Sequence, residues 1–119
     1  MKIKNPEDIA KRANATLEEL TRAVWLDLFS GVINDTRVDL GRMKGNWQTT
    51  VGAPAKGEID RLDKSGAETI RDMQSKIGGV NEVTYLTNNV PYVGVWERRD
   101  GMVARNLARI ETNIRKFSK

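Results

Sequence analysis

The chain has 119 residues, 39% of them hydrophobic and 30% charged, with a formal net charge of +4. This composition predicts one soluble globular domain over residues 1–119 and excludes a chain that is disordered throughout. Cysteine and histidine are both absent. Their absence excludes disulfides, thiolate nucleophiles, classical zinc sites and imidazole catalysis, and it indicates a reducing compartment. No apolar run approaches the roughly 20 residues of a membrane-spanning helix, and the charged start of the chain lacks the apolar core of a secretory signal.

A long amphipathic helix is predicted near the N-terminus. Asn5 can cap this helix, Pro6 suits its first position, and the helix is expected to end at Ser30, before Gly31. Its apolar stripe is wide, so we expect it to pack on a sheet or on a neighbouring subunit. The stripe consists of Ile9, Ala13, Leu17, Leu20, Val24 and Leu28, widened by Trp25, Phe29 and Val32.

The middle of the chain predicts short elements separated by a loop. Asp39 can cap a brief helix, and residues 47–51 alternate in the pattern of a five-residue strand. Residues 52–57 are expected to form a loop. The charged residues 58–64 fit either a short strand or an exposed connection.

A second helix and a second strand are predicted next. The segment Ser65–Glu68 has the pattern of a capping box, and the helix that it begins is expected to end at Gly78-Gly79. The alternation of residues from Val80 to Thr87 predicts a strand with Val83 and Tyr85 on one face.

The remaining elements complete the predicted fold class. Asn88 to Pro91 is expected to turn the chain, and residues 92–98 to form one or two helical turns. A C-terminal helix is predicted because apolar residues recur every three or four positions. The order helix, strand, helix, strand, helix predicts an α+β domain, with helices covering one side of a small antiparallel sheet. The apolar residues of the last helix are Val103, Leu107, Ile110, Ile114 and Phe117.

Two segments resemble the motifs of a known protein family. The first is Leu40-Gly41-Arg42-Met43-Lys44-Gly45-Asn46-Trp47. The second begins at Thr87-Asn88-Asn89-Val90-Pro91-Tyr92 and continues to Glu97 and Gly101-Met102-Val103. Together they resemble the signature of the tail-completion, or head–tail joining, minor tail proteins of long-tailed double-stranded DNA phages. The resemblance extends from Leu17 to Phe117.

The resemblance implies a fold, a function and partners. The implied fold is a twisted antiparallel sheet packed against the long N-terminal helix. The implied function is that of a virion structural protein, a hexameric ring in the neck that completes the tail and joins it to the head connector. The implied partners are other copies of the chain, the connector or head-completion protein, and the tail tube or tail terminator protein. The resemblance is compatible with a passing contact with DNA, and it implies no association with a membrane. Assembly would take place in the cytoplasm of the bacterial host, and the protein would end in the neck or tail of the virion.

Motif residues are expected to shape a corner and to contact neighbouring subunits. The resemblance makes Glu97 a candidate partner for an arginine of the neighbouring chain, whereas Trp47 and Tyr92 have core packing as an alternative role. Here only Arg98-Arg99-Asp100 separate Glu97 from Gly101, where the family has a longer glycine-rich loop, so the contacts of that loop are in question. The candidate contact residues are Trp47, Asn88, Asn89, Pro91, Tyr92, Trp96, Glu97, Arg98, Arg105 and Arg109, and Gly45 and Asn46 also match the first motif.

The charge distribution supports an alternative function, nucleic-acid binding by the segment Arg98–Lys119. This segment has seven basic residues and two acidic ones, an excess that attracts phosphate. Arg105 and Arg109 are expected to share a helix face, and charge reversal at both is expected to block partner attachment without disturbing the fold. No helix-turn-helix, aromatic RNA-binding signature or zinc knuckle is recognisable in the sequence.

No enzymatic activity, metal or cofactor is expected. Asp60 and Asp63 are three residues apart, but no third ligand or aromatic pocket accompanies them in the sequence. Such pairs usually face solvent. The serine and threonine hydroxyls have no histidine to activate them.

Overall fold

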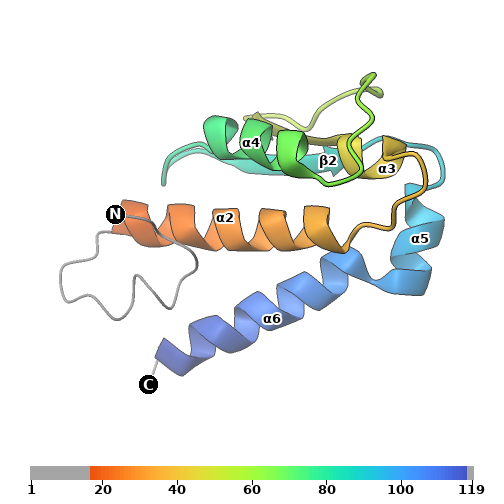
Figure 1. Cartoon of the computed structure of the whole chain (residues 1–119). Coiled ribbons are helices and arrows are strands. Elements are labelled where there is room, and N and C mark those ends of the chain that lie inside the picture. Colours follow the sequence, from red (N-terminus) through yellow and green to blue (C-terminus); the bar gives the residue numbers. More distant parts are fainter. Residues whose placement is uncertain (1–16, 118–119) are drawn as a thin grey trace.

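The structure is a computed structural model that describes residues 17–117, so the predicted helix start at Asn5 and Pro6 lies outside the described residues. The predicted α+β class is confirmed, because helices pack around a two-stranded antiparallel sheet (Figure 1). The elements are α2 (Leu17–Asp35), α3 (Arg42–Gly45), β1 (Trp47–Val51), α4 (Ala67–Lys76), β2 (Thr84–Asn88), α5 (Val93–Asp100) and α6 (Met102–Phe117).

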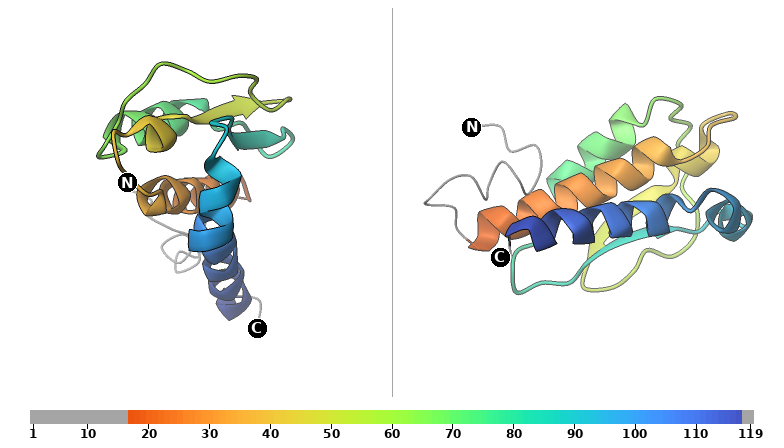
Figure 2. Two further views of the ribbon diagram at one scale, coloured as in Figure 1. Left: turned by 90° about the vertical axis from the view of Figure 1, so that its right-hand side faces the viewer. Right: turned by 90° about the horizontal axis from the view of Figure 1, so that it is seen from below.

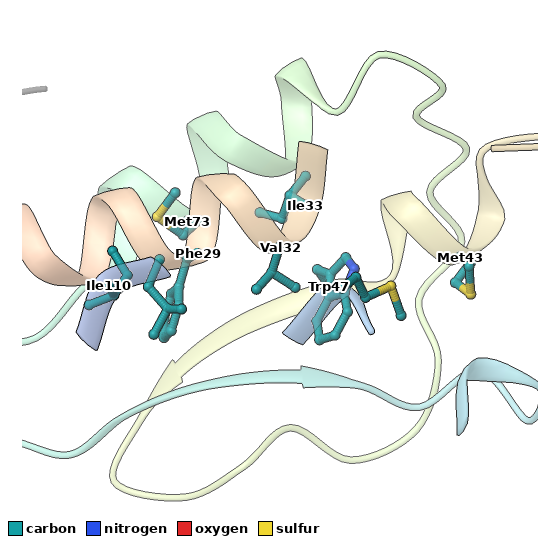
Figure 3. Packing of buried hydrophobic residues seen from close by; sticks show 9 residues of the cluster. Phe29, Val32, Ile33, Met43, Trp47, Met73 and Ile110 are labelled. Carbon is teal, nitrogen blue, oxygen red and sulfur yellow. The ribbon is translucent and has the colours of Figure 1, made fainter. Parts of the chain in front are cut away.

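Helix α2 is the central element. It packs against α4 and the sheet on one side and against α6 on the other (Figure 1). Figure 3 shows Phe29 and Val32 of α2 pointing toward β1, from which Trp47 projects. The wide stripe that the sequence predicts for α2 therefore serves two packed surfaces. The core cluster consists of Leu28, Phe29, Val32, Ile33, Met43, Trp47, Met73, Met102 and Ile110.

Gly31 lies inside α2, and the prediction that the helix ends there is wrong. The helix continues to Asp35. A Cβ atom on Gly31 would lie 2.1 Å from Oδ1 of Asn106 in α6. Asn106 is buried, and its amide donates hydrogen bonds to Asp35 (2.9 Å) and to the carbonyl of Met102 (2.7 Å). The glycine is thus needed because two helices approach closely at this position. In the sequence, such a glycine cannot be distinguished from one that ends a helix.

The sheet has the predicted first strand and a shorter second one. β1 has the predicted bounds and pairs with β2 in a register that places Trp47 opposite Asn88 and Val51 opposite Thr84. The predicted start of the second strand at Val80 is wrong, because β2 begins at Thr84 after a turn. Of the two alternating faces, the one with Thr84 and Leu86 points toward the core, since Thr84 is buried and Leu86 packs against the core cluster, whereas Val83 is 60% exposed.

The connection over residues 58–64 contains no strand, and Arg61 within it closes one edge of the sheet. The Arg61 guanidinium donates hydrogen bonds to the carbonyls of Gly45 (2.7 Å) and Trp47 (2.9 Å). It also lies 3.5 Å from a carboxylate oxygen of Asp72 in α4. A long side chain therefore replaces part of a missing neighbour strand beside β1.

Asp63 caps α4, so the predictions of a solvent-facing Asp63 and of a capping box at Ser65 are both wrong. The Asp63 carboxylate accepts hydrogen bonds from the backbone N–H of Gly66 (3.1 Å) and from the N–H (2.8 Å) and hydroxyl (2.7 Å) of Thr69. Burial raises the pKa of Asp63, but the bonds from Thr69 and Gly66 and the charge of Arg61 outweigh it, so its pKa lies below the ordinary value. Ser65 Oγ accepts only the N–H of Ala67 (3.2 Å).

Candidate interaction surface

The two motif segments are adjacent in space although they lie far apart in sequence. Trp47 of the first segment is the register partner of Asn88 in the second. The Asn88 side-chain N–H donates to the carbonyl of Met43 (2.8 Å), and its Oδ1 accepts the N–H of Val90 (3.2 Å). Asn88 thus joins α3 to the end of β2 and also forms the turn after the strand.

Two further asparagines fix the long loop against this corner. Asn89 donates from its side chain to the carbonyls of Ala55 (2.9 Å) and Gly57 (3.0 Å). Asn46, which is fully buried, accepts the N–H of Ile59 (2.8 Å) and donates to the carbonyl of Arg42 (2.8 Å). Their side chains act as substitutes for backbone hydrogen bonding, which explains the concentration of asparagine in both motifs.

Side chains from α5 and from the loop before α3 form an exposed apolar patch at this corner. We call Leu40, Tyr92, Val95 and Trp96 the corner patch. Leu40 is 63% exposed, Val95 is 47% exposed and Tyr92 is 37% exposed, while Trp96 is half-buried. A hollow of about 270 Å³ lies beside the patch and is lined by Arg37, Asp39, Leu40, Gly41, Arg42, Met43, Tyr92 and Trp96.

Arginines lie over both aromatic rings of the patch. Cζ of Arg37 is 4.3 Å from the centre of a Trp96 ring, and Cζ of Arg99 is 5.3 Å from it. Arg37 is held there by Asp100, to which its Nε donates at 3.2 Å, and this hydrogen bond lowers the pKa of the Asp100 carboxyl. On the other side of the hollow, Arg42 lies over Tyr92 and forms an ion pair with Glu58. The cations are therefore positioned before any partner binds.

The other predicted contact residues have different surroundings. Trp47 is buried, and its Nε1 donates to the hydroxyl of Thr36 (2.7 Å), which places it in the core. Pro91 is exposed at the turn before α5. The Glu97 carboxylate accepts the N–H groups of Val103 (2.9 Å) and Ala104 (3.2 Å), so it caps α6 within its own chain. Its pairing with an arginine of a neighbouring chain stays a prediction.

The basic residues of the C-terminal segment do not form one free face. Arg109 donates to both carboxylate oxygens of Asp27 in α2 (2.9 and 3.0 Å), so its charge reversal would also remove an ion pair between α6 and α2. Arg98 and Arg105 are exposed, and within the described residues the side chain of neither forms a hydrogen bond or an ion pair. Of Arg98, Arg105 and Arg109, these two therefore have side chains without a partner among the described residues.

Sequence reasoning missed three contributors to this surface, Arg37, Leu40 and Val95. Leu40 belongs to the first motif, and the sequence feature that could have revealed its exposure is an apolar side chain in a segment too short to bury it.

Among residues 17–117 no group of three acidic side chains could hold a metal ion, and none of the helices is long and apolar enough to cross a membrane. No family model, curated protein or solved structure matches the chain.

Proposed function

We propose that this chain is a structural subunit of the neck of a long-tailed phage, where a ring of identical copies completes the tail and joins it to the head connector. The observation that carries the proposal is the meeting of the two motif segments at one corner, through the pairing of Trp47 with Asn88 and the Asn88–Met43 hydrogen bond. A resemblance spread over two distant segments gains support when both segments build the same part of the molecule.

The corner patch supplies a contact of the expected kind. Tryptophan, tyrosine and arginine are enriched in protein–protein interfaces and carry most of their binding energy. Here Trp96 and Tyr92 are partly exposed and have arginines positioned over their rings. A closed ring requires head-to-tail contacts, so the corner patch would bind a different surface of the next copy. Connector and tail-tube proteins are the proposed neighbours above and below the ring.

Nucleic-acid binding is the second candidate function, and one observation favours it. Arg98 and Arg105 are exposed and unpaired within the described residues, so both can contact phosphate. Two such contacts give a weaker and less salt-dependent interaction than the seven basic residues of the segment would suggest. A subunit that lines a DNA passage needs no more than this.

The test is the particle mass of the purified chain at low and moderate salt, with and without a short DNA duplex. We expect a closed oligomer whose mass is unchanged by DNA. Leu40→Lys places a charge in the corner patch and is expected to abolish the closed ring with unchanged thermal stability. Leu17→Lys is the matched control, because Leu17 is similarly exposed (67%) at the other end of α2.

Each outcome decides between the proposals. A closed ring that Leu40→Lys abolishes and Leu17→Lys preserves supports the ring and the corner patch as its contact. A wild-type monomer that binds DNA with a steep salt dependence contradicts the ring and favours the nucleic-acid function. A closed ring that both variants preserve contradicts the role of the corner patch.

A further inference from the structure

The outer edge of β2 is open. The sheet has only two strands, so each strand has one edge without a strand neighbour. On the β1 side this edge is protected, because α4 packs against β1 and Arg61 bonds to the Trp47 carbonyl. β2 lies farther from α4 than β1 does (Figure 2). No described helix or strand adds to the β2 edge.

The pairing pattern identifies the backbone groups that point outward. Gly52 donates its N–H to the carbonyl of Val83, which places residue 83 in a hydrogen-bonded pair with β1. Hydrogen-bonded and non-hydrogen-bonded pairs alternate along antiparallel strands. The N–H and C=O groups of Thr84, Leu86 and Asn88 therefore point away from β1. No turn, loop or side-chain hydrogen bond within residues 17–117 reaches these backbone groups.

This edge has none of the features by which proteins block strand addition. Edge strands are usually protected by charged side chains, proline or a bulge. β2 reads Thr84-Tyr85-Leu86-Thr87-Asn88, without charge or proline, and its register with β1 is continuous. The exposed edge is thus fit for pairing.

Apolar hollows lie beside the open edge. One of about 200 Å³ is lined by residues of α2, the strands and α6, and another of about 300 Å³ continues from it past Leu86 toward α5. A strand added to β2 would direct alternate side chains to the face of Leu86, toward these hollows. The first hollow is lined by Trp25, Leu28, Phe29, Val32, Trp47, Thr84, Tyr85, Leu86 and Val103.

We propose that the open edge of β2 pairs with β2 of a second copy of the chain, antiparallel about a two-fold axis at Leu86. In this register Leu86 lies opposite Leu86 of the second copy, and Thr84 lies opposite Asn88. Every outward N–H and C=O of β2 then has a partner. Tyr85 lies opposite Thr87, a favourable aromatic and β-branched pair, and no like charges oppose one another. The Tyr85–Thr87 pair, which this register forms twice without opposing charges, is what favours a second copy over an unrelated extended peptide.

This contact goes beyond the proposed ring and does not depend on it. A two-fold contact uses the same patch on both copies, whereas a ring uses two different patches on each copy. The edge of β2 and the corner patch can therefore be disabled separately. Loss of one contact leaves the other measurable.

The test is disulfide crosslinking between two single-cysteine variants. In the proposed register, residue 85 of one copy and residue 87 of the other form a non-hydrogen-bonded pair, with Cα atoms roughly 4.5 Å apart, within the range of a disulfide. The natural chain has no cysteine, so nothing else can crosslink. Tyr85→Cys and Thr87→Cys proteins are mixed, allowed to exchange and oxidised. Each is also oxidised alone.

We expect crosslinked dimer in the mixture, in up to about half of the chains because random exchange makes half of the dimers mixed. Each variant alone should give little. Thr50→Cys mixed with Thr87→Cys is the matched control, since Thr50 is the β1 neighbour of Tyr85 and would lie one strand too far away. Equal crosslinking in the mixture and in the single variants would overturn the proposed register.

A second measurement on the wild-type chain protects the test against a misfolded variant. Sedimentation equilibrium over a wide concentration range should show association in steps of two chains. A mass that stays at one chain overturns the two-fold contact. A closed ring that yields no mixed crosslink from folded variants also overturns it, while leaving the ring proposal intact.

Discussion

Gly31→Ala tests the close approach of α2 and α6. In an ordinary helix interior this change stabilises by about 0.5–1 kcal/mol, because alanine has the higher helix propensity. Here the new methyl group would lie 2.1 Å from Oδ1 of Asn106 and 2.7 Å from a guanidinium nitrogen of Arg109. The side chain of Asn106 is buried and hydrogen-bonded, so it cannot move aside without losing those bonds.

The magnitude follows from the bonds that are lost. Asn106 bonds to Asp35, to Met102 and to Arg109, and each bond contributes about 1 kcal/mol. Losing all three and gaining helix propensity leaves a net destabilisation of about 2 kcal/mol. For a domain of this size that lowers Tm by about 10 °C.

The assay is thermal unfolding followed by circular dichroism, with Gly94→Ala as the control. Gly94 is also helical, but no atom lies within 4 Å of the position that its new methyl group would take, so this variant should be as stable as wild type or slightly more stable. If Gly31→Ala is as stable as Gly94→Ala, the close packing of α2 on α6 is refuted.

Three further predictions concern single side chains. Asp63→Asn should destabilise by about 2 kcal/mol at pH 7 in urea unfolding. Because the pKa of Asp63 is lowered in the folded state, its ionised carboxylate contributes fully to stability above the ordinary pKa of about 4, and this contribution is lost as the pH falls through the pKa of the folded state. The difference in unfolding free energy between Asp63→Asn and wild type should therefore disappear in acid. A difference that does not depend on pH contradicts this reasoning. Thr49→Val should raise the free energy of unfolding by about 1 kcal/mol. Among the described residues, Thr49 Oγ1 is the one buried side-chain polar atom without a hydrogen-bond partner. A lower Tm for this variant would show that the hydroxyl is bonded. Glu97→Ala should cost about 1 kcal/mol through loss of the α6 cap, and unchanged thermal unfolding would contradict that role.

Local patterns predicted the elements well. The alternation over residues 47–51 gave β1 with correct bounds, and the repeat of Val103, Leu107 and Ile110 correctly placed a helix at the C-terminus. Asn88 and Pro91 marked the turn before α5. These features depend on residues close in sequence, whose spacing alone decides which conformation buries the apolar side chains.

The errors involve contacts that the local pattern does not reveal. Gly31 resembled a helix stop because nothing nearby reveals that Asn106 packs against it. Asp63 resembled a solvated charge because its bonds to Gly66 and Thr69, three and six residues away, form only when the 58–64 connection folds back onto the start of α4. The sequence left the inward face of β2 open because Val83 and Leu86 belong to opposite alternating sets, and only packing on the helices decides between two sets that both contain apolar residues.

The candidate site was predictable in its shape and less so in its chemistry. The Asn88-Asn89 corner followed from turn propensities, and the structure adds the loop that Asn89 fixes. Arg109 appeared free in sequence, but its partner Asp27 lies in another helix. A basic segment therefore overstates the charge that a partner can reach, since acidic side chains of the same chain neutralise part of it.

The proposal of a neck protein is tested most directly by looking for the chain in phage particles purified from cells that express its gene. An affinity tag on the chain, detected by gold labelling in electron micrographs of purified particles, gives the position. The proposal predicts label confined to the junction of head and tail. Purified virions that lack the chain, or that carry the label elsewhere, would contradict it.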